Sequence, residues 1–406
     1  TVSSVRHSNS FYFKSNPRAH ARGFVISPAC NAHHSARMQK IKLGTSLFHS
    51  SSSDHYYLGT HQRTIRISTT SEQEIARALM RGATLDSLPS EIESDERDHF
   101  ISRLREAELL DTRESSIQLT KRAGSIVAER ATKIADFAGD AAYDQMRVRT
   151  LPELSQLSWS AAGSDDGGVA ALSARQSYSI ELSGNSRITT LLFQILIASG
   201  VTNTRISPSA RAGNQSISHL DIGVGFVTGK DFGGNYRKSC EGARHSISLF
   251  PEDRDSNYLE PLIAPTLKIH CGDIDPELLA FWMSSKQPYL IVSAPIGDSI
   301  TVGPLVEPGC TPCLRCFLLS EEDLRGYSRT QSIPLTSVSE VPMRVAHYIA
   351  ALVADFAIAY CDGAKSEGNK RNLIGNVLDI SYQALLETTL TPIARHPLCG
   401  CAFADL

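Results

Sequence analysis

Hydrophobic and polar positions between residues 43 and 112 follow the pattern of a small module of strands and helices. Residues 55–58 and 64–68 are rich in strand-forming side chains and flank a turn at Gly59. Apolar residues then recur three or four positions apart, which predicts helices. Two strands followed by three helices in so short a stretch predict a winged-helix-like fold for residues 43–112.

The three helices of this module have recognisable start signals. The first is expected to begin at a capping box formed by Ser71 and Glu74. The second covers residues 85–92 and is short or bent, because Pro89 lies inside it. The third follows Ser94, and its apolar positions are Phe100, Ile101, Leu104 and Leu109. The later helices also carry many acidic side chains, namely Glu91, Glu93, Asp95, Glu96, Asp98, Glu106 and Glu108. Such a surface is poorly suited to DNA phosphates.

Residues 113–175 are expected to form a helical linker to a larger domain. Apolar positions over residues 116–148 have the helical period and predict one long amphipathic helix. The polar, glycine-containing residues 160–168 predict a flexible connection. From residue 176 to residue 406 strand-like and helical segments alternate, which predicts an α/β domain.

The α/β domain opens like a Rossmann-like nucleotide-binding fold. A strand over residues 179–184, a helix over 188–199 and a strand over 204–207 have the order of its first unit.

The phosphate loop of such a fold is nevertheless incomplete. Of the three glycines in G-x-G-x-x-G only Gly184 is present, because Ser186 and Thr189 occupy the other two positions. A Cβ atom at both positions argues against tight binding of ATP or a dinucleotide. Residues 207–210 contain no carboxylate for a ribose or magnesium, and the glycine-rich residues 223–230 fit neither phosphate-loop spacing.

Two cysteine pairs carry the strongest chemical signal in the chain. Cys313 and Cys316 lie in T-P-C-L-R-C-F, and Cys399 and Cys401 lie in H-P-L-C-G-C-A. Four thiolates in two close pairs are what a tetrahedral structural zinc site needs. Buried thiols without metal, or a disulfide, are the alternatives, and Cys310 is a possible competitor for the metal. An all-sulfur site would leave no open position for a catalytic water.

Composition narrows the class of protein. A formal charge of −3 over 406 residues, with 41% hydrophobic and 20% charged residues, fits a soluble protein and gives no footprint for nucleic acid. The odd count of nine cysteines favours a reducing cytoplasm and metal use. The most apolar run, residues 348–361, contains Asp355 and predicts a buried helix rather than a membrane span.

Residues 1–42 are rich in Ser, His and Arg and have no hydrophobic period, so a disordered tail is expected. Met38 directly precedes the first strand-like run and is a candidate natural start. A cleaved targeting segment is the alternative for this stretch.

Taken together, these motifs resemble those of a known family. The chain resembles the ThiF-type (ubiquitin-activating-like) proteins that bind leader peptides for YcaO cyclodehydratases in the biosynthesis of thiazole/oxazole-modified microcins, a class of ribosomal peptides. The match lies in V-G-P-L-V-E-P-G-C-T-P-C-L-R-C over residues 302–316, in R-H-P-L-C-G-C-A over residues 395–402, and in the order of the winged module and the strand–turn–helix at Gly184.

The resemblance implies a ThiF-like α/β domain with a tetrathiolate zinc, preceded by a leader-peptide recognition element. The leader would add as a strand to the winged module, beside the helix over residues 95–109. The residues implied in this binding are Arg63, Thr64, Ile65, Arg66, Ile67 and Ser68. A YcaO-type partner would perform the ATP chemistry, and a homodimer is implied by analogy alone.

Three functions therefore remain open. The leading hypothesis is a non-catalytic scaffold that binds the leader of a precursor peptide and presents it to a YcaO cyclodehydratase for azoline formation. The first alternative is a ThiF-type enzyme that adenylates the C-terminus of a peptide or sulfur carrier. The second is a winged-helix regulator that senses a ligand.

Overall fold

The computed structural model describes residues 39–88, 93–113, 117, 119, 138–159, 165–184, 186–207, 216–226, 228–250, 265–327, 340–363 and 373–401. Several expectations lie outside these residues: the tail through Met38, residues 89–92 of the second helix, 120–137 of the long helix, 160–164 of the connection, and 208–210. The chain divides into two compact units. The N-terminal unit contains Thr1–Gln118 and Leu154–Ala170, and the C-terminal unit contains Leu119–Glu153 and Ala171–Leu406.

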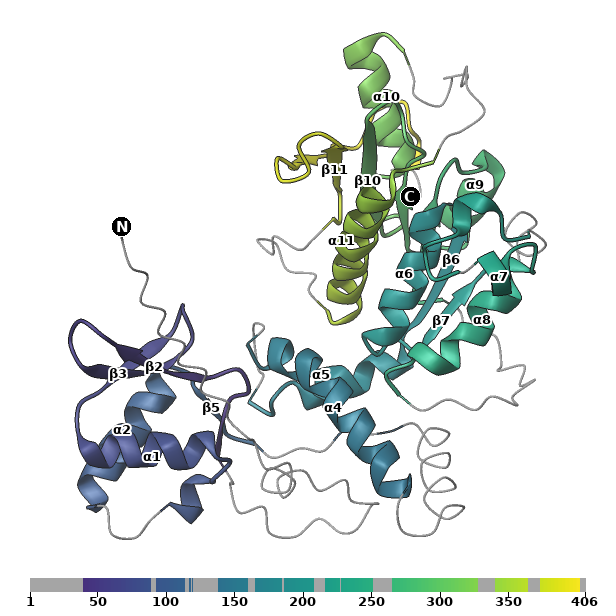
Figure 1. Ribbon diagram of the computed structural model, residues 1–406. Helices are drawn as coiled ribbons and strands as arrows, with labels where there is room; N and C mark the ends of the chain where they lie inside the picture. Colours follow the sequence, from purple (N-terminus) through teal and green to yellow (C-terminus); the bar gives the residue numbers. More distant parts are fainter. Residues whose placement is uncertain are drawn as a thin grey trace, which may run out of the picture. The chain divides into compact units, whose positions relative to one another are not determined.

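The N-terminal unit is built from a small antiparallel sheet and helices (Figure 1). The sheet has the order β2-β3-β4, with strands β2 (Ser46–Ser50), β3 (His55–Gly59) and β4 (Thr64–Ile67). The helical elements are α1 (Thr70–Met80), the single turn η1 (Leu85–Ser87) and α2 (Ser94–Glu106). A separate two-stranded ladder joins β1 (Lys40–Ile41) and β5 (Leu110–Asp111), so the end of the expected disordered tail over residues 1–42 is ordered. The apolar sides of β3, α1 and α2 enclose one core, which includes Leu58, Ile75, Leu79, Phe100 and Leu104.

Several local expectations for this unit need correction. Helix α1 is capped by Thr69, whose side chain accepts from the Glu72 N–H group, so the capping signal lies two residues before the expected Ser71–Glu74 box. The expected helix over 85–92 is a single turn in its described part. Strand β2 was not predicted, because its alternation in S-L-F-H-S is too short to stand out. The third helix is confirmed with its buried positions Phe100, Ile101 and Leu104, but it ends at Glu106, so Leu109 is buried outside the helix that was expected to reach it.

The helix expected over residues 116–148 differs at both ends: residues 117 and 119 are not helical, and α4 (Ala138–Trp159) extends well past residue 148 and contains Pro152. The short helix α5 (Val169–Ala174) and the turn η2 (Arg175–Ser177) follow. The expected flexible connection thus includes an ordered cap in its described part, because the Asp166 carboxylate accepts from the N–H groups of Gly168 and Ala170.

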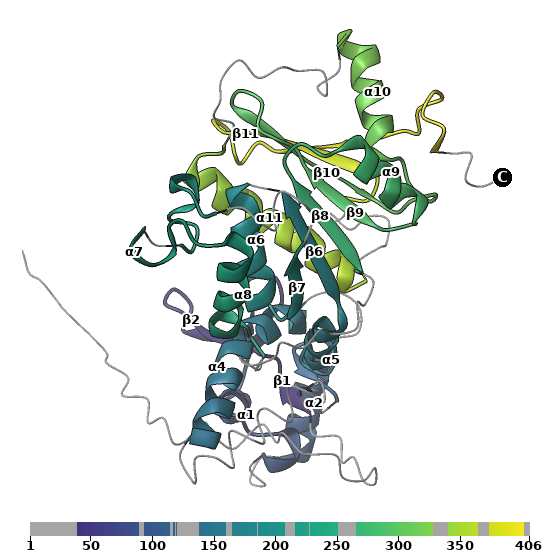
Figure 2. The same cartoon turned by 90° about the vertical axis from the view of Figure 1, so that its right-hand side faces the viewer.

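The C-terminal unit is organised around a seven-stranded mixed sheet of order β12-β11-β10-β9-β8-β6-β7 (Figure 2). Strands β6 (Ser179–Gly184), β7 (Asn203–Ile206), β8 (Leu267–Cys271) and β9 (Tyr289–Val292) are parallel. Strands β10 (Ser299–Val306), β11 (Asn376–Ser381) and β12 (Thr389–Pro392) extend the sheet in antiparallel fashion. The α/β class is therefore confirmed, and only the first half of the sheet has the parallel, Rossmann-like form.

Helices cover both faces of this sheet. The helical elements are α6 (Arg187–Ala198), η3 (His219–Asp221), α7 (Thr228–Asp231), α8 (Tyr236–Ile247), α9 (Pro276–Ser284), α10 (Leu314–Arg325) and α11 (Met343–Cys361). Strand β9 shows how the two faces arise, since successive side chains of a strand point to opposite sides. Leu290 and Val292 join the core under α6, α8 and α11, whereas Tyr289 and Ile291 join a second core with α9 and α10.

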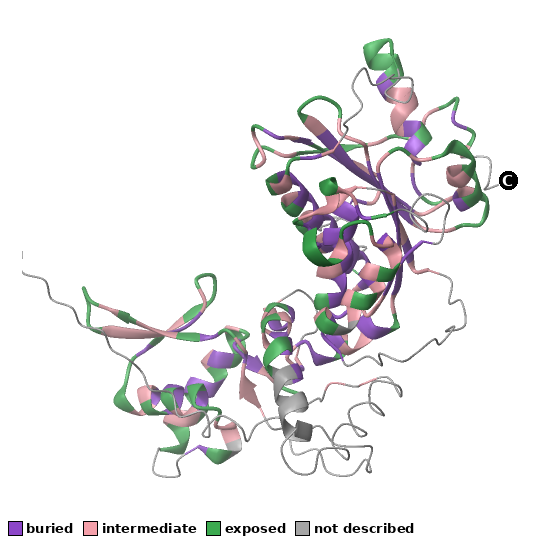
Figure 3. Ribbon diagram, turned by 45° about the vertical axis from the view of Figure 1, so that its right-hand side comes forward, coloured by how far each residue is buried: buried purple, intermediate pink, exposed green. Residues whose placement is uncertain are grey.

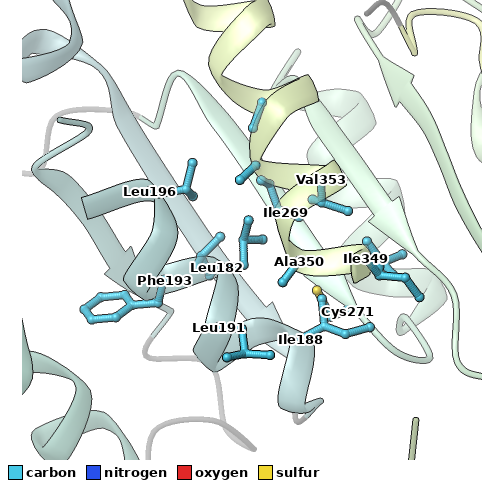
Figure 4. Packing of buried hydrophobic residues seen from close by; sticks show 14 of the residues in the cluster. Leu182, Ile188, Leu191, Phe193, Leu196, Ile269, Cys271, Ile349, Ala350 and Val353 are labelled. Carbon is cyan, nitrogen blue, oxygen red and sulfur yellow. The ribbon is translucent and has the colours of Figure 1, made fainter. Parts of the chain in front are cut away.

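The larger core lies between β6, β8, α6 and α11 (Figure 4). Leu182 and Ile269 point from the sheet toward Leu196 of α6 and Val353 of α11. Helix α11 has the length and hydropathy of a membrane span, but 67% of that window is buried inside the fold, as expected for a core helix (Figure 3). The prediction of a buried helix there is confirmed.

Candidate functional site

The four cysteines predicted as metal ligands lie together in the C-terminal unit. Cys313 precedes α10, Cys316 lies in its first turn, and Cys399 and Cys401 come from the end of the chain. The Sγ atoms of Cys313 and Cys399 are 3.3 Å apart, those of Cys316 and Cys401 are 3.4 Å apart, and all four lie within 4.8 Å of one another. Zn–S bonds of about 2.3 Å in a tetrahedron place the sulfurs about 3.8 Å apart. The cluster thus has the ligand number and the spacing that a metal ion needs.

The electrostatics of the cluster differ from one sulfur to the next. Burial raises the pKa of the Cys313 thiol well above its ordinary value. Burial also acts to raise the pKa of Cys316, but backbone hydrogen bonds from His396 and Cys313 outweigh it and lower that pKa to about 7. These hydrogen bonds therefore stabilise the thiolate of Cys316 more than that of Cys313, and a divalent cation would favour ionisation of the sulfurs that bind it.

The surroundings fix the loop that brings the second pair back. His396 Nε2 lies 2.9 Å from Asp323 Oδ2, which links the loop before Cys399 to α10. Trp282 and Tyr289 belong to the same buried cluster as Cys313, Cys316 and Cys399. Cys310 is exposed and does not belong to the group of four.

A second polar centre lies where β6 turns into α6. Gly184 has a φ of +100°, and a Cβ atom there would come within 1.9 Å of the Cys271 carbonyl oxygen. The glycine is thus required by the close approach of β6 and β8, whether or not a phosphate binds nearby.

The N–H groups at the start of α6 have partners within the chain. The Glu340 carboxylate accepts from the Ser186 hydroxyl (3.2 Å) and from the Arg187 N–H group (3.1 Å). The N–H group of Ile188 is bonded to Ser186 Oγ, and that of Thr189 to the Ser186 carbonyl. A helix N-terminus attracts anions because its N–H groups and dipole point at them. In this protein the anion is its own Glu340, which precedes α11 and which no sequence motif singled out.

The residues predicted to bind a peptide lie along β4 and at its two ends. Strand β4 is at the edge of its sheet, and it pairs only with β3 among the described strands. The Thr60 N–H group bonds to the Arg63 carbonyl, so these two residues form a hydrogen-bonded pair. Along an antiparallel ladder, hydrogen-bonded and non-hydrogen-bonded pairs then alternate. Ile65 and Ile67 consequently bond to β3 and pack on the core, whereas Thr64 and Arg66 turn their backbone groups to the free edge.

The far end of this edge is closed by side chains. Arg103 of α2 donates to the Arg66 carbonyl and, at 2.5 Å, to Glu72 Oε1. Glu72 Oε2 accepts from the Ser68 N–H group at 2.6 Å. Sequence patterns did not identify Arg103 or Glu72, since both read as ordinary charged positions of amphipathic helices.

A serine–histidine pair also lies on the sheet of the C-terminal unit. Ser183 Oγ is 2.8 Å from His270 Nδ1, and His270 Nε2 is 2.8 Å from the Asp273 carbonyl. Burial lowers the pKa of His270, which keeps the ring neutral with Nε2 as the donor. Ser183 and His270 are only 4% and 8% exposed, so the pair satisfies buried polar atoms rather than offering a nucleophile.

No protein-family model matches the sequence, and no curated protein matches it. Solved structures do share its fold. The chain is similar to E. coli MccB with AMPCPP and MccA at 13% identity and a TM-score of 0.55, over 90% of this chain and 99% of the other. It is similar to E. coli MccB with ATP at the same identity, coverage and TM-score. The microcin C7 biosynthetic enzyme MccB with N-formylated MccA matches at 13% identity and a TM-score of 0.56, over 90% and 99% of the two chains. At this identity the likeness shows the fold.

Proposed function

We propose that this protein binds the leader of a ribosomal precursor peptide and presents it to a YcaO-type cyclodehydratase, without performing ATP chemistry itself. The N-terminal unit would hold the leader, and the ThiF-like C-terminal unit would be the scaffold, in a cytoplasmic, homodimeric complex. The observation that carries the proposal is the Glu340 carboxylate at the start of α6. An ATP phosphate placed there would meet a negative charge and N–H groups that already have acceptors.

The free edge of β4 supports the peptide-binding part. An exposed strand edge with unused N–H and C=O groups is a template for an added strand. Thr64 turns such groups to the edge, and so does the N–H group of Arg66, whereas the Arg66 carbonyl accepts from Arg103. Ile65 and Ile67 anchor the strand to the core. The structure of MccB with MccA provides an example of this fold in a biosynthetic enzyme with a bound partner.

We further propose that Cys313, Cys316, Cys399 and Cys401 hold a structural zinc ion. Four buried or partly buried sulfurs form a closed donor set with no position for a reacting water. The metal would fasten the end of the chain to α10 and so to the sheet.

An adenylating enzyme is the second candidate, because E. coli MccB with ATP has the same fold. The two functions differ in ATP–pyrophosphate exchange with the captured peptide present. A scaffold gives background exchange, whereas exchange above background supports adenylation and refutes the role proposed for Glu340.

Peptide binding is tested by capture with a matched pair of variants. Thr64→Pro removes one N–H group that faces the free edge and leaves the β3 ladder intact, whereas Thr64→Ala keeps that N–H group. Small peptides that co-purify with the wild-type chain are identified by mass spectrometry and titrated as synthetic peptides. We expect Thr64→Pro to weaken binding about tenfold or more, and Thr64→Ala to leave it nearly unchanged. Equal affinity of all three proteins would refute the assignment of the β4 edge.

A further inference from the structure

We propose that Arg103 determines peptide specificity by pairing with an acidic side chain of the bound strand. The inference rests on the proposed function of the β4 edge and adds the chemical class of the peptide. It follows from the position of Arg103, which now occupies a backbone acceptor that an added strand needs.

Arg103 and Glu72 make hydrogen bonds to the β4 edge that the backbone of an added strand would otherwise make. Arg103 donates to the carbonyl of Arg66, and Glu72 accepts from the N–H group of Ser68. These are successive edge positions, since every second residue of a strand faces the same side. A peptide can therefore pair with Thr64 freely, but it reaches the Arg66 carbonyl only by displacing Arg103.

Displacement leaves one arm of the guanidinium without its acceptor. The other arm remains with Glu72, whose side chain is only 4% exposed and whose distance to Arg103 Nη1 is 2.5 Å. Arg103 is itself 24% exposed and lies 5.8 Å from the Phe100 ring centre, so its movement is limited. A guanidinium arm that loses its acceptor can form a charge-assisted, bidentate pair with a carboxylate, which is its strongest partner.

One arginine of this edge, Arg66, is paired with a histidine and not with a carboxylate. Arg63 is paired with Glu108, and Arg103 with Glu72, whereas the Arg66 guanidinium bonds to His55 Nε2. The edge therefore carries three arginines and two paired carboxylates. Glu96, at the start of α2, already accepts from the Thr69 hydroxyl. We infer that the bound peptide places an Asp or Glu next to the residue that bonds to the Arg66 carbonyl.

The experiment is a selection from a displayed library of random short peptides on the full-length protein. Wild type is compared with Arg103→Gln combined with Glu72→Gln, which keeps a neutral hydrogen-bonding pair in place of the ion pair. Arg105→Gln is the control, because Arg105 lies on the same helix and bonds to Gln39 instead. The best wild-type peptide and its copy with the acid changed to the amide are then titrated by fluorescence anisotropy.

We expect one acidic position to be enriched on wild type and Arg105→Gln and lost on the double variant. The amide copy should bind wild type about tenfold more weakly and the double variant nearly as well as the acidic peptide. Peptides that bind through the edge without an acidic preference, or with one that survives in the double variant, overturn the role of Arg103 while leaving the proposed function standing. If no peptide is enriched, or if Thr64→Pro enriches the same peptides, the proposed function itself fails. The comparison of the acidic peptide with its amide copy uses the wild-type protein, so this result does not depend on the folding of a variant.

Discussion

Two helices of the C-terminal unit, α6 and α10, begin at polar centres that are filled in different ways. At α6 the Glu340 carboxylate accepts from Ser186 and Arg187, so charge and hydrogen bonds are satisfied within the chain. At α10 four sulfurs converge, and the Sγ atoms of Cys313 and Cys399 approach to 3.3 Å. The first centre is complete as it stands, whereas the second would be completed by the proposed cation.

This difference shows that any helix N-terminus attracts an anion, whereas the sequence decides which group lies there. A helix N-terminus attracts any anion, whether phosphate, carboxylate or thiolate. A Rossmann-like fold supplies such a helix after its first strand, and in this chain the Glu340 side chain lies there. Fold likeness alone would predict a nucleotide site, and the contacts of Glu340 argue against one.

The largest effect is expected at α10. Cys399→Ser removes one of four sulfurs, so we expect metal content to fall from about one ion per chain and the free energy of unfolding of the C-terminal unit to fall by on the order of 5 kcal/mol. Metal analysis and urea unfolding followed by Trp282 fluorescence, in a Trp159→Phe background, measure both. Cys310→Ser is the control, because that thiol is exposed and outside the group. If the wild-type protein contained no metal and were no more stable than Cys399→Ser, the proposed cation at this centre would be contradicted.

A smaller effect is expected at α6. Glu340→Ala removes two hydrogen bonds and a favourable charge from the helix end, which should lower the free energy of unfolding by about 1–2 kcal/mol. Glu387→Ala, at an exposed carboxylate, is the matched control and should change stability little. Urea unfolding with the same Trp282 signal compares them, and equal stability of the two variants would show that Glu340 does not serve as a cap.

The smallest effect is expected at the partly buried carboxyl group of Asp111, which lies in β5 and not at a helix end. Burial is the main cause that raises the pKa of Asp111 from 3.8 to about 6, and Lys42 only partly offsets it. Because the folded-state pKa lies above the unfolded one, this group lowers stability as pH rises from about 4 to 6. Asp111→Asn should remove that slope and stabilise the N-terminal unit at neutral pH by about 1 kcal/mol, since solvent screens part of the charge.

The pH dependence is measured by urea unfolding with Trp159 as the probe in a Trp282→Phe background. Asp98→Asn on α2 is the control, because the Asp98 side chain is 71% exposed. An unchanged slope in Asp111→Asn would mean that the carboxyl group ionises as freely in the folded protein as in the unfolded chain.

Local signals and long-range contacts differed in how far the sequence could predict them. The bounds of β6 and α6 follow from a short apolar run, a glycine and a period of 3.6, all read within one segment. The cysteine cluster was predictable because metal ligands come in recognisable pairs. Glu340 was not, because its partner Ser186 lies 154 positions away and a single carboxylate has no pattern. The role of Arg103 was not predictable for the same reason, since its acceptor is a backbone oxygen on another element.

Hydrogen–deuterium exchange of the full chain tests most directly whether this protein binds peptides at β4 and leaves ATP to a partner. The captured peptide and Mg·ATP would be added separately, and protection would be followed at Thr64, at Arg66 and over residues 184–190. We expect the peptide to protect the two β4 amides and ATP to leave residues 184–190 unchanged. Protection of residues 184–190 by ATP, with none at β4 by the peptide, would contradict both halves of the proposal and favour an adenylating enzyme.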